Sequence, residues 1–190
     1  MGRSREFDDD AVVRAARDVF WLRGYVATSL SQLQQATGLS KSSLYEAYGS
    51  KRGLFERAAQ SYLEEIIWPL LAPMEAPGAG RQSVVDYFLN LAAYFRSGPL
   101  GEQSRGCLIV NVSMDLNDLD AQAADLVTGL RIRTRGAILN ALRSIDGLDD
   151  PEQVADMLTS GQMGLMATAR ADAEQSAGVA QTYANFVLAL

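Results

Sequence analysis

Residues 30–55 read LSQLQQATGLSKSSLYEAYGSKRGLF, and no other part of the chain says as much about its fold. Two short amphipathic helical patterns are joined by a three-residue corner, Gly38-Leu39-Ser40. Gly38 can adopt the positive φ that ends a helix, and Ser40 can cap the next helix at Ser43. This layout is typical of a helix-turn-helix, whose second helix enters the DNA major groove. The alternative is a solvated αα-hairpin.

The flanking residues extend the helical pattern in both directions. Apolar spacing predicts a helix over about residues 9–23, and Ser29 with Gln32 forms a capping box for the helix that follows. Ser50 can cap a fourth helix, which should bend or end at Trp68-Pro69 because the proline ring disfavours helical geometry just before it. Residues 73–80 are rich in proline and glycine and predict a loop. Further helices are predicted at about 81–96, 106–115, 120–144, 151–169 and 172–189.

These patterns predict an all-α protein of two parts: a helix-turn-helix domain over residues 1–49 and a helical domain over residues 50–190. Only the run 107–112 is ambiguous between helix and strand. Charge divides in the same way. Residues 1–58 carry nine Lys and Arg against seven Asp and Glu, whereas the whole chain has a net charge of -6. A basic N-terminal part facing nucleic acid and an acidic body fit this asymmetry, and the small positive excess favours a dimer.

Composition also excludes several classes of protein. No apolar run reaches the 18 residues of a transmembrane helix, and the start does not resemble a signal peptide, so we expect a cytoplasmic protein that does not enter membranes. One Cys and no His leave no internal disulfide and no familiar zinc site, and we expect no cofactor. The absence of His also removes the most common general base of enzymes, which argues against an enzyme.

The chain resembles the TetR/AcrR family of bacterial transcriptional regulators. The resemblance covers about residues 7–58, and residues 105–111 resemble a GCLxxN segment found in one branch of the family. It is carried by three motifs: Phe20-x-x-x-Gly24-Tyr25-x-x-Thr28-Ser29, Ala36-x-Gly38-Leu39-Ser40-Lys41-x-x-Leu44-Tyr45-x-x-Tyr48 and Ser50-Lys51-x-x-Leu54-Phe55.

This resemblance implies a homodimer of about nine helices per subunit. The first three would bind a palindromic DNA operator, and the rest would enclose a pocket for a small-molecule effector. The helices at about 151–169 and 172–189 would form the dimer interface, where Gly161 and Gly164 permit close approach and Leu158, Leu165, Tyr183, Phe186 and Val187 supply apolar area. An ordinary intrachain helix pair is the alternative.

Eight residues are candidates for DNA contacts. Thr28 and Ser29 begin the second helix, where hydroxyl and N–H groups can bind a phosphate. By resemblance, Ser42, Ser43 and Tyr45 would touch bases or the adjacent backbone, and Lys51 a phosphate. Lys41 either binds a phosphate or is solvated. Glu46 departs from the family pattern and either points to solvent or accepts a hydrogen bond from cytosine N4.

Nine further residues are candidates for effector binding or sensing. Seven are large apolar side chains that suit a plastic pocket, although ordinary core packing explains each of them as well: Trp68, Phe88, Leu91, Phe95, Met114, Met163 and Met166. Cys107 is predicted in the first turn of a helix near Arg105, where its thiol either senses reactive species or packs as a small buried residue. Asn111, one turn later, could hydrogen-bond a ligand or a backbone carbonyl.

The sequence therefore predicts a DNA-binding transcriptional regulator. The family resemblance implies that it is a repressor, which an effector releases from its operator. A helical protein-interaction module with a vestigial helix-turn-helix is the alternative. Salt dependence separates the two, because contacts between basic side chains and phosphates weaken steeply as salt rises.

Overall fold

The computed structural model describes residues 7–97, 105–113 and 121–190, and every regular element in these ranges is a helix, as predicted. The chain divides into two compact units, residues 1–66 and 67–190. The sequence-based division after Gly49 lies one helix earlier. The difference arises because the fourth helix packs against the first.

Unit 1–66 is held together by an aromatic core. The helix α1 packs against α2 and α4, and α3 packs against α2 and α4. The rings of Phe20 and Phe55 meet edge to face with centroids 5.2 Å apart, and those of Trp21 and Tyr62 lie 4.9 Å apart. Edge-to-face ring pairs of this kind are worth about 0.5–1.5 kcal/mol each beyond the area they bury, and both pairs here join α1 to α4. The helices are α1 (Asp9–Arg23), α2 (Leu30–Thr37), α3 (Lys41–Tyr48) and α4 (Lys51–Tyr62).

A buried arginine also ties α1 to the end of this unit. Arg17 is 9% exposed, and its Nη1 lies 2.8 Å from Glu65 Oε2 and 3.3 Å from Ser61 Oγ. Burial acts to raise the pKa of Glu65, but hydrogen bonds from Arg17 and Ser61 outweigh it and hold that pKa below its ordinary value. The carboxylate therefore stays ionised and keeps its place beside α1.

The fourth helix was predicted to bend or end at Trp68-Pro69, and a new α-helix, α5 (Trp68–Glu75), does begin there. The α-helical pattern of α4 stops earlier, at Tyr62, and a π-helical turn, η1 (Leu63–Ile67), separates α4 from α5. Pro69 is tolerated because it lies in the first turn of α5, where its missing N–H has no required partner. Pro73 lies inside α5 as well, so the loop predicted from residue 73 begins at Ala76. If α4, η1 and α5 are counted together, the described residues contain the nine expected helices.

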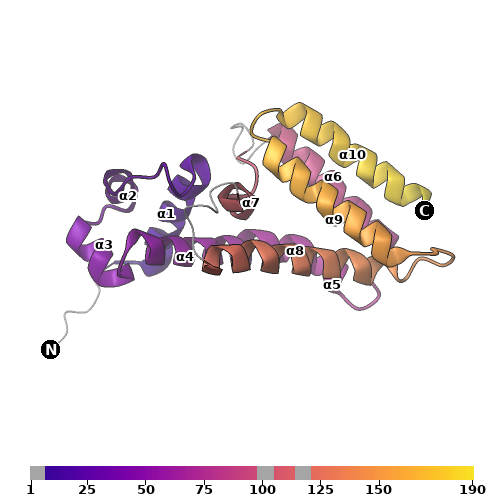
Figure 1. The fold of residues 1–190 in the computed structure, drawn as a ribbon, viewed down its shortest axis with the longest axis horizontal. Helices are drawn as coiled ribbons and strands as arrows, with labels where there is room; N and C mark the ends of the chain where they lie inside the picture. The colour runs from indigo at the N-terminus through magenta and orange to yellow at the C-terminus, as the bar shows by residue number, and fades with distance from the viewer. Residues whose placement is uncertain (1–6, 98–104, 114–120) are drawn as a thin grey trace. The chain divides into compact units, whose positions relative to one another are not determined.

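In unit 67–190, α8 packs against α5, α6, α7 and α9, while α10 lies along α6 (Figure 1). The ambiguous run at 107–112 belongs mostly to the short helix α7. Phe88, Phe95, Leu108 and Ile138 are at most 1% exposed and form the centre of the core. The helices are α6 (Arg81–Ser97), α7 (Leu108–Ser113), α8 (Ala121–Leu142), α9 (Pro151–Thr168) and α10 (Ala173–Ala189).

The described residues contain neither a membrane-spanning helix nor a cluster of metal ligands. None of the helices there combines the length and hydrophobicity that crossing a membrane requires. In the same ranges, no three His, Cys, Asp or Glu side chains gather in a way that could hold a metal ion.

Candidate DNA interface and interior cavity

The corner between α2 and α3 has the predicted caps. Gly38 adopts φ +70° and its N–H donates to Gln34 O over 2.9 Å, which ends α2. Ser40 Oγ accepts a hydrogen bond from Ser43 N at 3.1 Å, which begins α3. The capping box at the start of α2 is confirmed too, since Ser29 and Gln32 bond reciprocally. Short-range chemistry alone thus fixes both helix ends.

Three serine hydroxyls cluster at the start of α3. Ser40 Oγ lies 2.8 Å from Ser42 Oγ and 2.9 Å from Ser43 Oγ, in addition to the bond it accepts from Ser43 N. Ser42 is exposed and Ser43 half-buried. The two hydroxyls predicted to meet DNA are thus held in place by a third, Ser40, that the sequence singled out only as a cap.

The two faces of α3 have opposite roles. Leu44 is 3% exposed, and Tyr48 donates a hydrogen bond to Asp9 Oδ1 over 2.8 Å, so this face anchors the helix inside unit 1–66. Lys41, Ser42 and Tyr45 line a shallow open hollow on the outer face. Lys41 Nζ lies 5.8 Å from the centroid of the Tyr45 ring, within reach of a cation–π attraction.

Glu46 is exposed on α3, and the contacts of unit 1–66 leave both of its predicted roles open. Lys51, the first residue of α4, is half-buried. Its Nζ lies 4.5 Å from the centroid of the Tyr25 ring and 3.5 Å from Val26 O. Burial lowers the pKa of Lys51, which a neighbouring phosphate would oppose by favouring the charged form.

Thr28 and Ser29 are placed differently from each other. Thr28 is 2% exposed and its hydroxyl donates to Gly24 O over 2.6 Å, so that hydroxyl supports the turn after α1 and is turned away from solvent. Ser29 is exposed at the N-terminus of α2. Of the two, Ser29 is therefore the residue whose position suits a phosphate contact.

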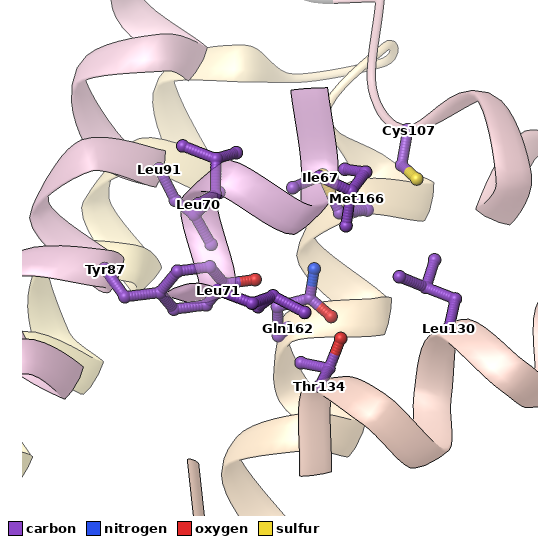
Figure 2. Close-up of a pocket in the computed structure, with 10 residues that line it drawn as sticks. All are labelled: Ile67, Leu70, Leu71, Tyr87, Leu91, Cys107, Leu130, Thr134, Gln162 and Met166. Atoms are coloured by element: carbon purple, nitrogen blue, oxygen red, sulfur yellow. The ribbon is translucent and has the colours of Figure 1, made fainter. Parts of the chain in front are cut away.

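An interior cavity lies within unit 67–190, between α5, α6, α8, α9 and the residue before α7 (Figure 2). Its volume is about 10 Å³, roughly what one water molecule needs. Three of the predicted effector residues, Leu91, Cys107 and Met166, line it. The sequence reasoning missed seven others: Ile67, Leu70, Leu71, Tyr87, Leu130, Thr134 and Gln162.

The remaining predicted effector residues do not line this cavity. Phe88 and Phe95 are core residues with at most 1% exposure, and Met163 is half-buried. The guanidinium of Arg133 stacks on the Trp68 ring, with Arg133 Cζ 4.0 Å from the ring centroid. Met114 lies outside the described residues. Core packing, the alternative kept open for these side chains, accounts for Phe88 and Phe95.

The segment before α7 is braced by its own backbone. Cys107 is 1% exposed and lies one residue before α7, whereas the sequence placed it in the first turn. Asn111 Nδ2 donates to Arg105 O over 2.9 Å, which is the structural one of its two predicted roles. Gly106 has φ +64°, and a Cβ there would lie 2.7 Å from Met166 O. Only glycine fits this approach.

The outer surface of α9 and α10 carries exposed apolar side chains. Met157 is 44% exposed, Val179 36% and Phe186 38%. Other residues predicted for a dimer interface point inward instead: Leu158, Leu165 and Val187 are at most 5% exposed within their own chain. Gly161 is also used within the chain, since the Tyr183 ring fills the space where its Cβ would be.

This chain resembles known proteins in sequence and in fold. The family model described as bacterial regulatory proteins, tetR family, matches residues 12–58. The chain is 36% identical over 124 residues to the uncharacterized HTH-type transcriptional regulator YezE of Bacillus subtilis, covering 65% of this chain and 62% of YezE. It is 31% identical over 133 residues to the HTH-type transcriptional repressor ComR of Escherichia coli, covering 70% of this chain and 60% of ComR. The matches thus span less than two thirds of these relatives.

A solved structure extends the likeness over nearly the whole chain. It is the TetR family transcriptional regulator CifR, a cysteine mutant complexed with 26-base-pair double-strand operator DNA. The TM-score is 0.71 at 28% identity, and the match covers 96% of this chain and 98% of CifR.

Proposed function

Because this chain belongs to the TetR family of bacterial regulatory proteins, we propose that it is a DNA-binding transcriptional regulator and that α3 is its recognition helix. One observation carries the proposal: the two faces of α3 are divided between anchoring and exposure. Leu44 and Tyr48 fix the helix on its unit, and Lys41, Ser42 and Tyr45 remain open on the other side. A rigidly held polar helix face is what reading a groove requires.

The proposed contacts fall into two groups. Ser29, Lys41 and Lys51 are suited to phosphates, because they offer a helix N-terminus or a positive charge. Ser42, Ser43, Tyr45 and Glu46 are suited to base edges or the sugar–phosphate backbone next to them. The first group would position the protein on any duplex, and the second would select the sequence.

We further propose that the regulator acts as a homodimer through the exposed face of α9 and α10, on two half-sites whose recognition helices lie about 34–36 Å apart. The exposed apolar side chains Met157, Val179 and Phe186 on these two helices support this. An effector bound inside unit 67–190 would release the operator, as in a repressor. A coupling of about 1–3 kcal/mol between the two sites is sufficient.

The experiment that tests this function starts from genomic DNA. Fragments retained by the purified protein are sequenced, and a shared near-palindrome should emerge. Its affinity is then measured against salt, and a steep fall is expected if several basic side chains meet phosphates. Absence of any preferred duplex, with a flat salt response, would favour the interaction module instead.

Lys51→Ala provides a sharper test of one contact. Operator binding should weaken, and the slope of log affinity against log salt should become less steep by about 0.9 for each phosphate that is no longer neutralised, or roughly 1.8 for a dimer. Fluorescence anisotropy between 50 and 200 mM salt, as the approximate range, measures the slope. Arg131→Ala, at an exposed arginine on α8, is the matched control and should leave it unchanged. Equal slopes for Lys51→Ala and the unsubstituted protein would remove Lys51 from the contacts.

A further inference from the structure

One polar atom beside the cavity of unit 67–190 lacks a hydrogen bond. Gln162 is 3% exposed, and its Oε1 is buried with no hydrogen-bond partner among the described residues. Figure 2 shows the amide of Gln162 in the midst of the cavity lining. A buried acceptor left unpaired destabilises the folded state, so a group that donates a hydrogen bond there is bound with an advantage.

The rest of the lining determines what kind of molecule can carry that donor. Six of the ten lining residues are Ile, Leu or Met, and none is a Lys, Arg, Asp or Glu. Tyr87 is also neutral, because burial, and secondarily Cys107, raises the pKa of its hydroxyl. A charged ligand would lose its hydration and find no opposite charge here. The cavity therefore selects against ions.

The cavity must widen to admit anything larger than water. Leu70 is 39% exposed although it lines the cavity, so its side chain lies between the interior and solvent. Met166, on the opposite helix α9, is unbranched and adapts readily to new shapes. Ile67 is the last residue of the π-helical turn η1, and Leu70 and Leu71 follow it in α5. Widening of the cavity would therefore displace the start of α5.

We propose that this cavity binds a compact, uncharged, largely apolar molecule through one O–H or N–H group that donates to Gln162 Oε1. The inference deepens the proposed function, on which it rests, by assigning a chemical class to the effector. Gln162 is its specificity-determining residue. The apolar walls supply affinity for any molecule of suitable size, and the amide discriminates between those that can donate a hydrogen bond and those that cannot.

The test compares phenol with toluene, which has nearly the same shape but no donor. Binding of each probe to the full chain is measured by calorimetry in the absence of DNA, for the unsubstituted protein and for Gln162→Met. Methionine keeps the length of the side chain and removes its acceptor. The ratio of phenol affinity to toluene affinity should fall by roughly fivefold or more in the variant, because phenol then leaves its own donor unpaired. Use of the ratio cancels the different hydration of the two probes.

Thr159→Val is the matched control. Thr159 lies three residues earlier on α9, and its Oγ1 is likewise buried without a hydrogen-bond partner among the described residues, but it does not line the cavity. The ratio of phenol affinity to toluene affinity in the Thr159→Val protein should equal that of the unsubstituted protein. The proposal is overturned if Gln162→Met leaves the ratio unchanged, if Thr159→Val lowers it equally, or if neither probe binds the unsubstituted protein at millimolar concentration. Failure of operator binding, measured separately without probes, would overturn the proposed function and leave the cavity result standing.

Discussion

Replacing Phe186 by Glu is expected to turn the proposed dimer into monomers and to weaken operator binding by about 100-fold or more. Phe186 is 38% exposed at the end of α10, and Val179 lies seven residues earlier on the same side of the helix. A carboxylate buried in an apolar interface would lose its hydration without gaining a partner. Two half-sites bound together gain roughly 10²–10⁴ over one, and a monomer loses that gain.

Analytical ultracentrifugation and anisotropy measurements on the same samples test this prediction. Ile132→Glu is the matched control, since Ile132 is a 59% exposed apolar residue on α8 of the same unit. It should leave both the mass and the affinity as they were. A Phe186→Glu protein that remains dimeric and binds its operator normally would show that this face is not the interface.

Gly53→Ala is expected to lower operator affinity about tenfold or more and the free energy of unfolding by about 1–3 kcal/mol. A Cβ at Gly53 would collide with the carbonyl oxygen of Tyr48, the last residue of α3. That oxygen belongs to the backbone, so α3 must shift relative to α4. The helix that carries Lys41, Ser42 and Tyr45 would then be displaced from the rest of its unit.

The control for this prediction uses the same substitution where there is space. A Cβ on Gly136, an exposed residue of α8, meets no atom within 4 Å. Gly136→Ala should raise stability by up to about 1 kcal/mol, because alanine favours the helix over the unfolded chain. Urea denaturation gives both values. If Gly53→Ala also stabilises the protein, the close approach to Tyr48 is relieved without cost and α3 is not displaced.

Most of the N-terminal unit could be predicted from the sequence because its helix ends are set by neighbouring residues. Ser29, Gly38, Ser40 and Ser50 act on groups no more than four positions away, and all four cap helices as expected. The helical spacing of apolar residues also predicted the ends of α6 and α9 to within a residue or two.

What could not be predicted has local as well as distant causes. An interruption before Pro69 was expected, but no residue pattern indicated that it would be a π-helical turn. Thr28 stands where a phosphate contact was predicted, but its hydroxyl donates to Gly24 O, four residues earlier. The cavity was only partly predicted because its walls come from five segments that are far apart in the sequence. One signal was available: Gln162 is a polar residue four positions after Leu158 and four before Met166, both of which are apolar.

The hydroxyl cluster at the start of α3 has a consequence for sequence selection. Ser40 Oγ has one hydrogen and two lone pairs, and one lone pair already accepts from Ser43 N. If the Ser42 hydroxyl donates to Ser40 Oγ, the Ser40 hydroxyl can donate only to Ser43 Oγ. If the Ser43 hydroxyl donates to Ser40 Oγ instead, the Ser40 hydroxyl donates to Ser42 Oγ. If Ser42 and Ser43 read neighbouring base pairs, as proposed, those base pairs would be recognised jointly, and the energetic penalty of two mismatches would differ from the sum of the single penalties.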